Sequence, residues 1–237
     1  MTRLLPLLLL LVACGSDTDI RDLYFPVRGL TDGRVYVYDN TGTLPGPPQE
    51  YWYYLGIDQD TALYLTATHY GPDFSPDQMI RERVTNRGME LVELTLLQTD
   101  SNGLARPTPT EILFDRVFPF ELSDPSAASG YRISFQNGDA TTYVTLNRRY
   151  LRDTTVTVPG GAAGAGVTVH GGLFELRGEV SLRDPVDGDI SPTFTGYEIY
   201  GEGIGLVEYF RDLGAAGTLG GKLRERLTMP QFEARVR

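Results

Sequence analysis

The sequence predicts an all-β protein built as a single antiparallel curved sheet or open barrel, with few or no helices. Short runs rich in β-branched and aromatic residues follow one another along the chain, and glycine, proline, asparagine and aspartate separate them. No long apolar stripe at helical spacing competes with these runs. The runs that fit strands are 34–39, 51–57, 61–70, 79–86, 89–99, 111–118, 131–136, 141–151, 154–158, 167–182, 194–200, 206–210 and 223–228.

Residues 1–13 have the organisation of a secretion signal. The short positive start Met1-Thr2-Arg3 leads into an apolar run over residues 4–13 that only Pro6 interrupts. A helix that spans a bilayer needs roughly 20 apolar residues, and this run has about half that number. The segment therefore fits a cleaved signal peptide and is too short for a membrane span.

Cys14 directly follows this run and is the only cysteine of the chain. The tetrapeptide Leu11-Val12-Ala13-Cys14 resembles the lipobox of bacterial lipoproteins, in which a diacylglyceryl group alkylates the thiol and the peptide is cut just before the cysteine. Only a thiol offers the soft nucleophile that this thioether requires. We therefore expect lipidation at Cys14 and, because two or more acyl chains hold a protein stably on a membrane, a membrane partner through this anchor. An ordinary cleaved signal with a chance cysteine is the alternative.

Residues 14–23 are predicted to be the lipidated cysteine and an acidic tether. Gly15 follows Cys14, in place of the aspartate that keeps some lipoproteins at the inner membrane, so the outer membrane is the expected location. The aspartates of the tether resemble those that send some lipoproteins to the cell surface. Both a periplasmic and a surface-exposed position stay open.

The charge of the chain argues against nucleic acid as a partner. The formal net charge is −10, and it becomes −11 once Arg3 is removed with the signal. Lys222 is the only lysine, and no basic run is present. Phosphate backbones are bound by clustered lysine and arginine, so we expect no nucleic-acid binding.

Three turns carry a hairpin signature. Asn137-Gly138 lies between two predicted strands, and this pair readily adopts the positive φ angles of a tight hairpin. The segments 86–88 and 101–103 have similar compositions. These turns predict antiparallel pairing between neighbours in sequence.

One predicted strand has a helical alternative. Ser75-Pro76-Asp77-Gln78 fits a capping box with proline at the first helical position. A strand is favoured there because the run leads directly into the turn at residues 86–88. Three prolines make residues 44–48 a loop, and residues 159–166 form a flexible Gly/Ala-rich insertion. Neither divides the chain, so residues 24–237 are predicted to be one β domain.

Aromatic residues are concentrated in the first quarter of the chain. Such rings either line the strands of a β protein or form a stacking surface for an apolar or carbohydrate ligand. The rings are Tyr24, Phe25, Tyr36, Tyr38, Tyr51, Trp52, Tyr53 and Tyr54.

Four segments, in order along the chain, resemble a large group of uncharacterised Bacteroidota-type outer-membrane lipoproteins. They are Tyr24-Phe25-Pro26-Val27, Gly33-Arg34-Val35-Tyr36-Val37-Tyr38, residues 154–160 and residues 200–207. Tyr36 stands where those proteins usually have tryptophan, and the insertion after Gly160 is longer here. The resemblance implies a curved sheet or open barrel akin to the periplasmic carriers that shield lipoprotein acyl chains. It implies no activity and no catalytic residues.

No catalytic constellation is recognisable in the sequence. His69 and His170 are the only histidines, and no nucleophile elbow, Walker loop or zinc-protease motif accompanies them. The glycines at 201, 203 and 205 lack the spacing of a dinucleotide fingerprint and fit bulges or close strand approaches. We predict no enzyme, no cofactor and no catalytic residue.

Two kinds of acidic cluster have residue types that could form a metal site or a catalytic site. Asp184, Asp187 and Asp189 surround a glycine turn and offer oxygen ligands to calcium, but the spacing fits no EF-hand loop, so a solvated hairpin tip is favoured. The acid pairs 58/60 and 90/93 have the residue types of glycosidase carboxylates and equally those of exposed strand faces. No metal site is predicted.

The expected function is a non-enzymatic binding or carrier module at the cell envelope. A structural or adhesive surface module without a ligand pocket is the alternative, and a hydrolase is a third. A concave cavity of about 300 Å³ or more favours the carrier, and a filled core with no cavity favours the scaffold. A hydrolase requires converging acids or a histidine–acid pair in a cleft.

Overall fold

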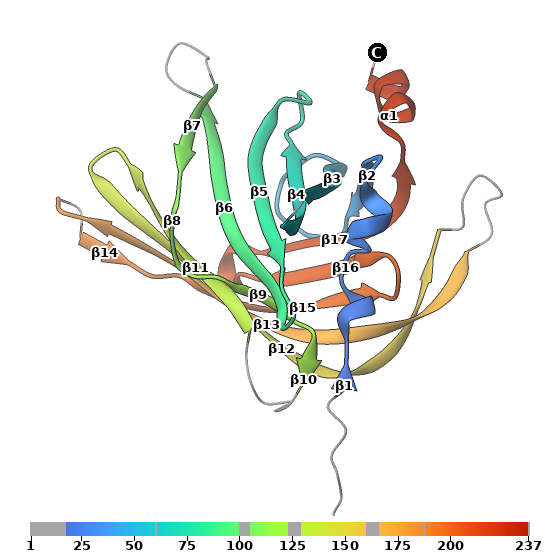
Figure 1. The fold of residues 1–237 in the computed structure, drawn as a ribbon. Coiled ribbons are helices and arrows are strands. Elements are labelled where there is room, and N and C mark those ends of the chain that lie inside the picture. Colours follow the sequence, from blue (N-terminus) through green and yellow to red (C-terminus); the bar gives the residue numbers. More distant parts are fainter. Residues whose placement is uncertain are drawn as a thin grey trace, which may run out of the picture.

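Most described residues of the computed structural model belong to β-strands, which confirms the predicted fold class (Figure 1). The structure describes residues 18–59, 61–99, 105–122, 129–159, 166–186 and 188–236. In these residues one 15-stranded antiparallel sheet has the order β7-β6-β5-β4-β3-β2-β17-β16-β15-β13-β12-β11-β8, with β14 beside β13 and β9 beside β6. Its strands are β2 (Arg34–Asn40), β3 (Gln49–Gln59), β4 (Ala62–Tyr70), β5 (Pro76–Val84), β6 (Gly88–Thr99), β7 (Ala105–Pro109), β8 (Glu111–Phe114), β9 (Arg116–Pro119), β11 (Ser129–Asn137), β12 (Ala140–Val158), β13 (Val167–Asp184), β14 (Gly188–Ile190), β15 (Thr193–Gly201), β16 (Gly205–Asp212) and β17 (Thr218–Leu227).

Short elements complete the fold. Strands β1 (Thr18–Asp19) and β10 (Glu121–Leu122) pair with each other. The described residues also contain three 3-10 turns, Arg21–Leu23 (η1), Val27–Leu30 (η2) and Gly214–Ala216 (η3), and one α-helix, α1, at Met229–Val236. No helix among the described residues is long and apolar enough to cross a membrane.

The segment 105–119 brings the two ends of the sheet together, so the sheet is nearly closed into a barrel. Strands β7 and β9 pair with β6, whereas β8, between them in sequence, pairs with β11 at the other end. Main-chain hydrogen bonds at the junctions join the seam: the Thr110 N–H donates to Leu94 O at 3.1 Å, and the Leu91 N–H donates to Asp115 O at 2.8 Å. The single strand predicted over residues 111–118 is therefore two strands that turn to opposite partners.

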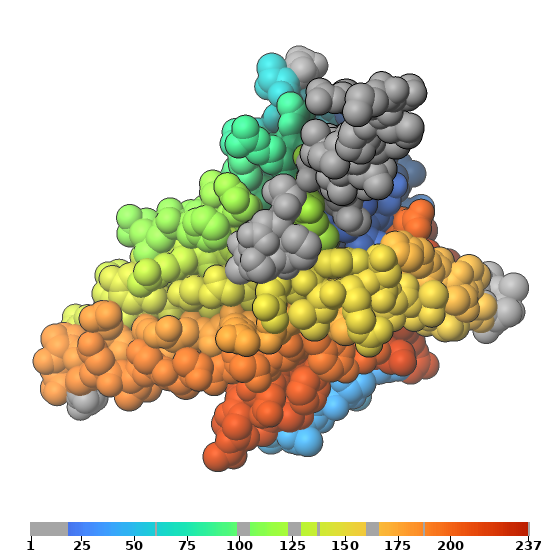
Figure 2. Space-filling view, turned by 90° about the horizontal axis from the view of Figure 1, so that it is seen from below, coloured from blue at the N-terminus to red at the C-terminus, as the bar shows by residue number. Residues whose placement is uncertain are grey.

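Strands β12 and β13 run together beneath the rest of the barrel, as the yellow and orange bands of Figure 2 show. The sequence predicted two strands here, over residues 141–151 and 154–158, but β12 is continuous. The register shifts at Leu151, between Tyr150 and Arg152, and the polar residues Arg152 and Asp153 pair regularly with Leu173 and Gly172. The predicted hairpin before β12 is confirmed, since Asn137 pairs with Ala140 and Gly138 has a φ of 64°.

Two similar sequence patterns fold differently. Thr228-Met229-Pro230-Gln231 forms a capping box that begins α1: the Thr228 N–H donates to Gln231 Oε1 at 2.9 Å, and the Gln231 N–H donates to Thr228 Oγ1 at 3.4 Å. The similar segment Ser75–Gln78 instead enters β5, as favoured from the sequence. The residues that follow decide the outcome, because 79–84 pair with strands on both sides whereas Met229, Phe232 and Val236 have helical spacing.

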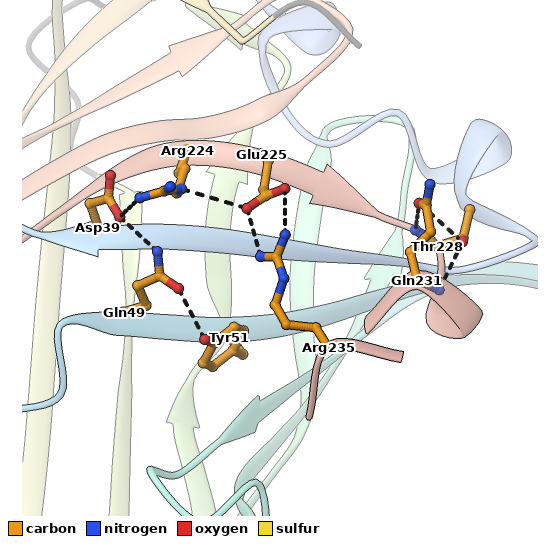
Figure 3. A network of polar contacts seen from close by, with 8 residues as sticks. All are labelled: Asp39, Gln49, Tyr51, Arg224, Glu225, Thr228, Gln231 and Arg235. Atoms are coloured by element: carbon orange, nitrogen blue, oxygen red, sulfur yellow. Dashed lines mark hydrogen bonds and ion pairs between the residues drawn. The ribbon is translucent and has the colours of Figure 1, made fainter. Parts of the chain in front are cut away.

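Helix α1 covers a second, smaller apolar cluster on the outer face of the sheet. Phe232 packs there against Val35, Val37 and Leu227. A polar network fixes the helix beside this cluster (Figure 3): Arg235 donates to both oxygens of Glu225, at 2.6 and 3.0 Å. Bidentate pairs of this kind fix orientation as well as distance.

Residues 20–30, which we call the N-terminal plug, enter the barrel at the lower end in Figure 1, above β1. The Ile20 N–H donates to Phe120 O at 2.8 Å, and the plug buries the side chains of Ile20, Leu23, Tyr24, Phe25, Val27 and Leu30. The prediction of an acidic tether up to Leu23 is therefore wrong for residues 18–23. These residues belong to the fold, because β1 pairs with β10 and the apolar side chains that follow it are buried. Residues 1–17, which include the predicted signal and Cys14, lie outside the described residues.

Close contact between the plug and the wall predicts the effect of a substitution at Gly56. A Cβ atom at Gly56 would lie 2.0 Å from Val27 O, so the plug backbone would have to move. Gly56→Ala is expected to lower the free energy of unfolding by about 2–3 kcal/mol in denaturant titrations.

Gly29→Ala is the matched control within the plug, because a Cβ there would meet only Pro26 Cβ, at an ordinary 3.8 Å. It is expected to change stability by less than about 1 kcal/mol. Equal effects of the two substitutions would show that the plug does not press on the wall at Gly56.

Candidate functional site

The barrel interior is filled with aromatic side chains. Tyr24 of the plug lies 4.6 Å from the Phe118 ring and 5.8 Å from the Tyr200 ring between centroids, and Phe25 stacks on Tyr54 at 4.2 Å. These contacts join strands from several parts of the sheet through one central cluster. Of the eight aromatic residues in the first quarter of the chain that could have formed a stacking surface, five are buried here: Tyr24, Phe25, Tyr36, Tyr38 and Tyr54. They line the core.

A buried ion pair crosses this interior. Arg148 Nε lies 2.6 Å from Glu198 Oε2, and the side chains are 5% and 3% exposed. Arg148 Nη1 also donates to Val117 O at 2.5 Å, and the Tyr200 hydroxyl donates to Glu198 at 3.0 Å. Burial pushes the pKa of Glu198 upward, but the Arg148 guanidinium outweighs it and holds that pKa below its usual range.

A second buried acid holds the plug. The Tyr24 hydroxyl donates to Glu82 Oε2 at 2.7 Å, linking the plug to β5. Burial raises the pKa of Glu82 to about 7, although the Tyr24 hydrogen bond and the Arg148 charge oppose the rise. Sequence reasoning named none of these charged residues, although Glu82 alternates with Ile80 and Val84 on one strand face.

A cleft of about 710 Å³ opens where the plug meets three turns of the barrel. Tyr24, Phe25 and Val27 contribute from the plug. The walls come from the β3–β4 turn, the β5–β6 turn, the β15–β16 turn and the Phe120 ring, so they unite segments far apart in sequence. The cleft lies beside the filled core and is not a hollow inside it.

The rim of the cleft carries charges of both signs. The Arg21 guanidinium lies 4.9 Å from the centroid of the Phe120 ring. Arg28 Nη1 pairs with Asp58 Oδ2 at 3.0 Å. Apolar side chains such as Leu63 and Met89 line the same cleft. This combination suits an amphiphilic molecule, whose apolar part needs burial and whose polar part needs hydrogen bonds.

The two histidines lie in different places. His69 Nδ1 contacts Asp77 Oδ1 at 2.5 Å, and its ring lies 4.7 Å from the Trp52 ring. His170 lies between Asp153, at 3.0 Å, and Glu202, at 3.5 Å. Of the residues around His170, Glu202 lines the cleft, whereas the His170 side chain does not.

The acidic residues considered as calcium ligands or glycosidase carboxylates bind neighbouring backbone N–H groups or arginines. Asp184 accepts from the Val186 N–H at 2.7 Å, and Asp189 pairs with Arg183 at 3.3 Å, while Asp187 lies outside the described residues. Glu90 pairs with Arg83 at 2.6 Å. Asp58 pairs with Arg28, and its predicted partner at position 60 is also outside the described part. Within that part, no group of three or more histidine, cysteine, aspartate or glutamate side chains is arranged to hold a metal ion.

The β15–β16 turn contains glycines with positive φ angles and contacts the plug at Phe25. Gly203 and Gly205 have φ angles of 68° and 98°. A Cβ at Gly205 would lie 2.4 Å from the Phe25 ring. The close approach expected from the sequence is found at Gly205, where the neighbour is a plug side chain, whereas a Cβ at Gly203 would meet no described atom within 4 Å. The expected bulge lies in the preceding strand, where the register shifts between Ile199 and Tyr200.

Two solved structures, from Parabacteroides distasonis and Bacteroides fragilis, are similar to this chain. A protein of Parabacteroides distasonis described as a lipoprotein matches with a TM-score of 0.52 and 16% identity, over 88% of this chain and 100% of that chain. A Bacteroides fragilis protein, described as exported and with a YmcC-like fold, matches with a TM-score of 0.47 and 12% identity, over 82% of this chain and 95% of that chain. No protein-family model and no curated protein matches. At these identities the comparison shows a shared fold alone.

Proposed function

We propose that this protein is a lipoprotein, anchored to the outer membrane through Cys14, that binds an amphiphilic ligand in the cleft without transforming it. The single observation that carries the proposal is the cleft of about 710 Å³, which is lined by both apolar and charged side chains. Its volume exceeds the about 300 Å³ that favours a carrier over a scaffold.

The position of the cleft supports the membrane part of the proposal. Arg21 and Asp22, which line the cleft, follow Cys14 closely in sequence. A chain of n residues spans at most about 3.6 Å × n, so an anchor at Cys14 would keep the cleft close to the bilayer. The ligand source would then be the membrane itself or molecules at its surface.

Filling the cleft tests the proposal. Ala62 lines the cleft, and an indole side chain at this position would occupy ligand space. With the full chain in mild detergent and the fluorescent apolar probe N-phenylnaphthylamine, Ala62→Trp is expected to weaken binding at least about tenfold.

Val167→Trp is the matched control, since Val167 is 53% exposed and outside the cleft lining. It should bind the probe as the unmodified chain does. Equal probe binding by all three proteins would contradict the assignment of the cleft and favour a scaffold or adhesive module.

A further inference from the structure

The paired strands β12 and β13 place four polar side chains in one square on the outer face of the sheet. Asn147 is opposite Arg177, and Arg149 is opposite Glu175. Their neighbours Arg148, Phe174 and Leu176 are buried on the inner face, as strand alternation requires. We call this square the arginine notch; its residues, with Arg148, line a recess of about 180 Å³.

The arginine notch carries a surplus of positive charge. Glu175 forms an ion pair with Arg149 Nη2 at 2.7 Å and accepts a hydrogen bond from Arg177 Nη2 at 3.0 Å. The Arg177 hydrogen bond lowers the pKa of Glu175, so this carboxylate is ionised at neutral pH. Two arginines and one glutamate give a net charge of 2 − 1 = +1 in a chain whose total is −10.

Unused hydrogen-bond donors face this recess. The Arg149 and Arg177 side chains are 43% and 68% exposed, and each guanidinium has five N–H groups. Asn147 adds an exposed amide beside them.

From this geometry we propose that the arginine notch binds a phosphate group. Guanidinium groups match phosphate oxygens in planar, bidentate geometry, and two of them held by one carboxylate are oriented in advance. The recess is well below the about 300 Å³ of ordinary small-molecule sites, which suits a single tetrahedral anion. The site is separate from the cleft, with which it shares no lining residue.

The phosphate group has two chemical sources, free phosphate and a lipid headgroup. The outer faces of β12 and β13 belong to the lower side of the molecule, where β1 also lies (Figures 1 and 2). Three residues separate Cys14 from Thr18, a span of at most about 14 Å. An anchored chain therefore brings a lipid phosphodiester within reach of this side.

Titration calorimetry of the full chain in a nonionic detergent tests the proposal with two probes, inorganic phosphate and glycerophosphoglycerol, which is the phosphodiester headgroup of phosphatidylglycerol without the acyl chains that the cleft would bind. Arg149→Gln and Arg177→Gln are each expected to weaken phosphate binding about tenfold or more. Arg183→Gln is the matched control, because it removes the same charge from β13, the strand of Arg177, at a 62% exposed residue outside the recess.

Binding of both probes, lost in the two arginine-notch variants and kept in Arg183→Gln, would establish the site and a lipid headgroup as a source. Binding of inorganic phosphate alone, with the same variant pattern, would establish the site for free phosphate. An equal loss of phosphate binding in Arg183→Gln would show that only the overall charge of the protein matters, and it would overturn the proposal. The absence of binding heat with either probe at millimolar concentration would also overturn it. Thermal unfolding of each variant checks that the fold is retained, and Ala62→Trp should leave phosphate binding unchanged.

Discussion

Replacing Glu198 by glutamine is expected to lower the free energy of unfolding by about 3–5 kcal/mol. The substitution removes the countercharge of Arg148 and leaves a guanidinium in the core, where both side chains are at most 5% exposed. Water cannot compensate the charge there, and a neutral amide accepts a much weaker hydrogen bond. Urea titrations of the full chain and the variant measure the difference.

Glu90→Gln is the matched control. It breaks a pair of similar length, 2.6 Å between Arg83 Nη2 and Glu90 Oε2, but the side chains are 47% and 32% exposed. Surface pairs contribute about 0–1 kcal/mol, so this variant should remain close to the unmodified chain. A loss of less than about 1 kcal/mol in Glu198→Gln would show that water reaches the pair.

Glu82→Gln is expected to stabilise the protein at alkaline pH. The folded-state pKa of Glu82 is about 7, against 4.5 in the unfolded chain, so folding favours the protonated acid. The contribution of this group is fully present below pH 4.5 and is lost as the pH rises through 7. The difference between the two pKa values corresponds to about 3 kcal/mol. Glutamine keeps the shape of the protonated acid and does not ionise.

The stabilisation by Glu82→Gln should therefore grow by about 2–3 kcal/mol between about pH 5 and pH 8. Tyr24→Phe is a second test variant, because the Tyr24 hydrogen bond lowers the pKa of Glu82. Without this hydrogen bond, the free energy of unfolding should fall more steeply as the pH rises. A constant difference between Glu82→Gln and the unmodified chain at all pH values would mean that Glu82 is not buried as an isolated acid.

The strand pattern predicted most of the sheet because alternation and turn residues are local signals. The sequence does not predict β7, because Pro107 and Pro109 argue against a ladder, yet among the described residues β7 pairs with β6 alone and prolines are tolerated in such an edge strand. The start of β17 was missed because Gly220 and Gly221 weaken a strand pattern, although close approaches of Thr41 and Tyr209 require them.

The core and the cleft could be predicted only in part. Tyr36 and Tyr54 follow the alternation of their strands, so their burial was foreseeable as the packing alternative. The start of helix α1 also has a local sequence pattern, the capping box at Thr228–Gln231. The cleft had none, because the plug, three turns and Phe120 meet only after the sheet closes. The arginine notch likewise depends on the register of Asn147 with Arg177, which no single segment encodes.

Native mass spectrometry of the full chain, purified from bacterial membranes in mild detergent, tests the central proposal most directly. Lipidation at Cys14 would add a covalent mass that survives denaturation. A ligand in the cleft would add a further mass that unfolding releases, and Ala62→Trp should lack it. The expected result is both masses in the unmodified chain and only the covalent mass in the variant. A chain without any releasable mass, in both proteins, would contradict the assignment of the cleft as a binding site for an amphiphile.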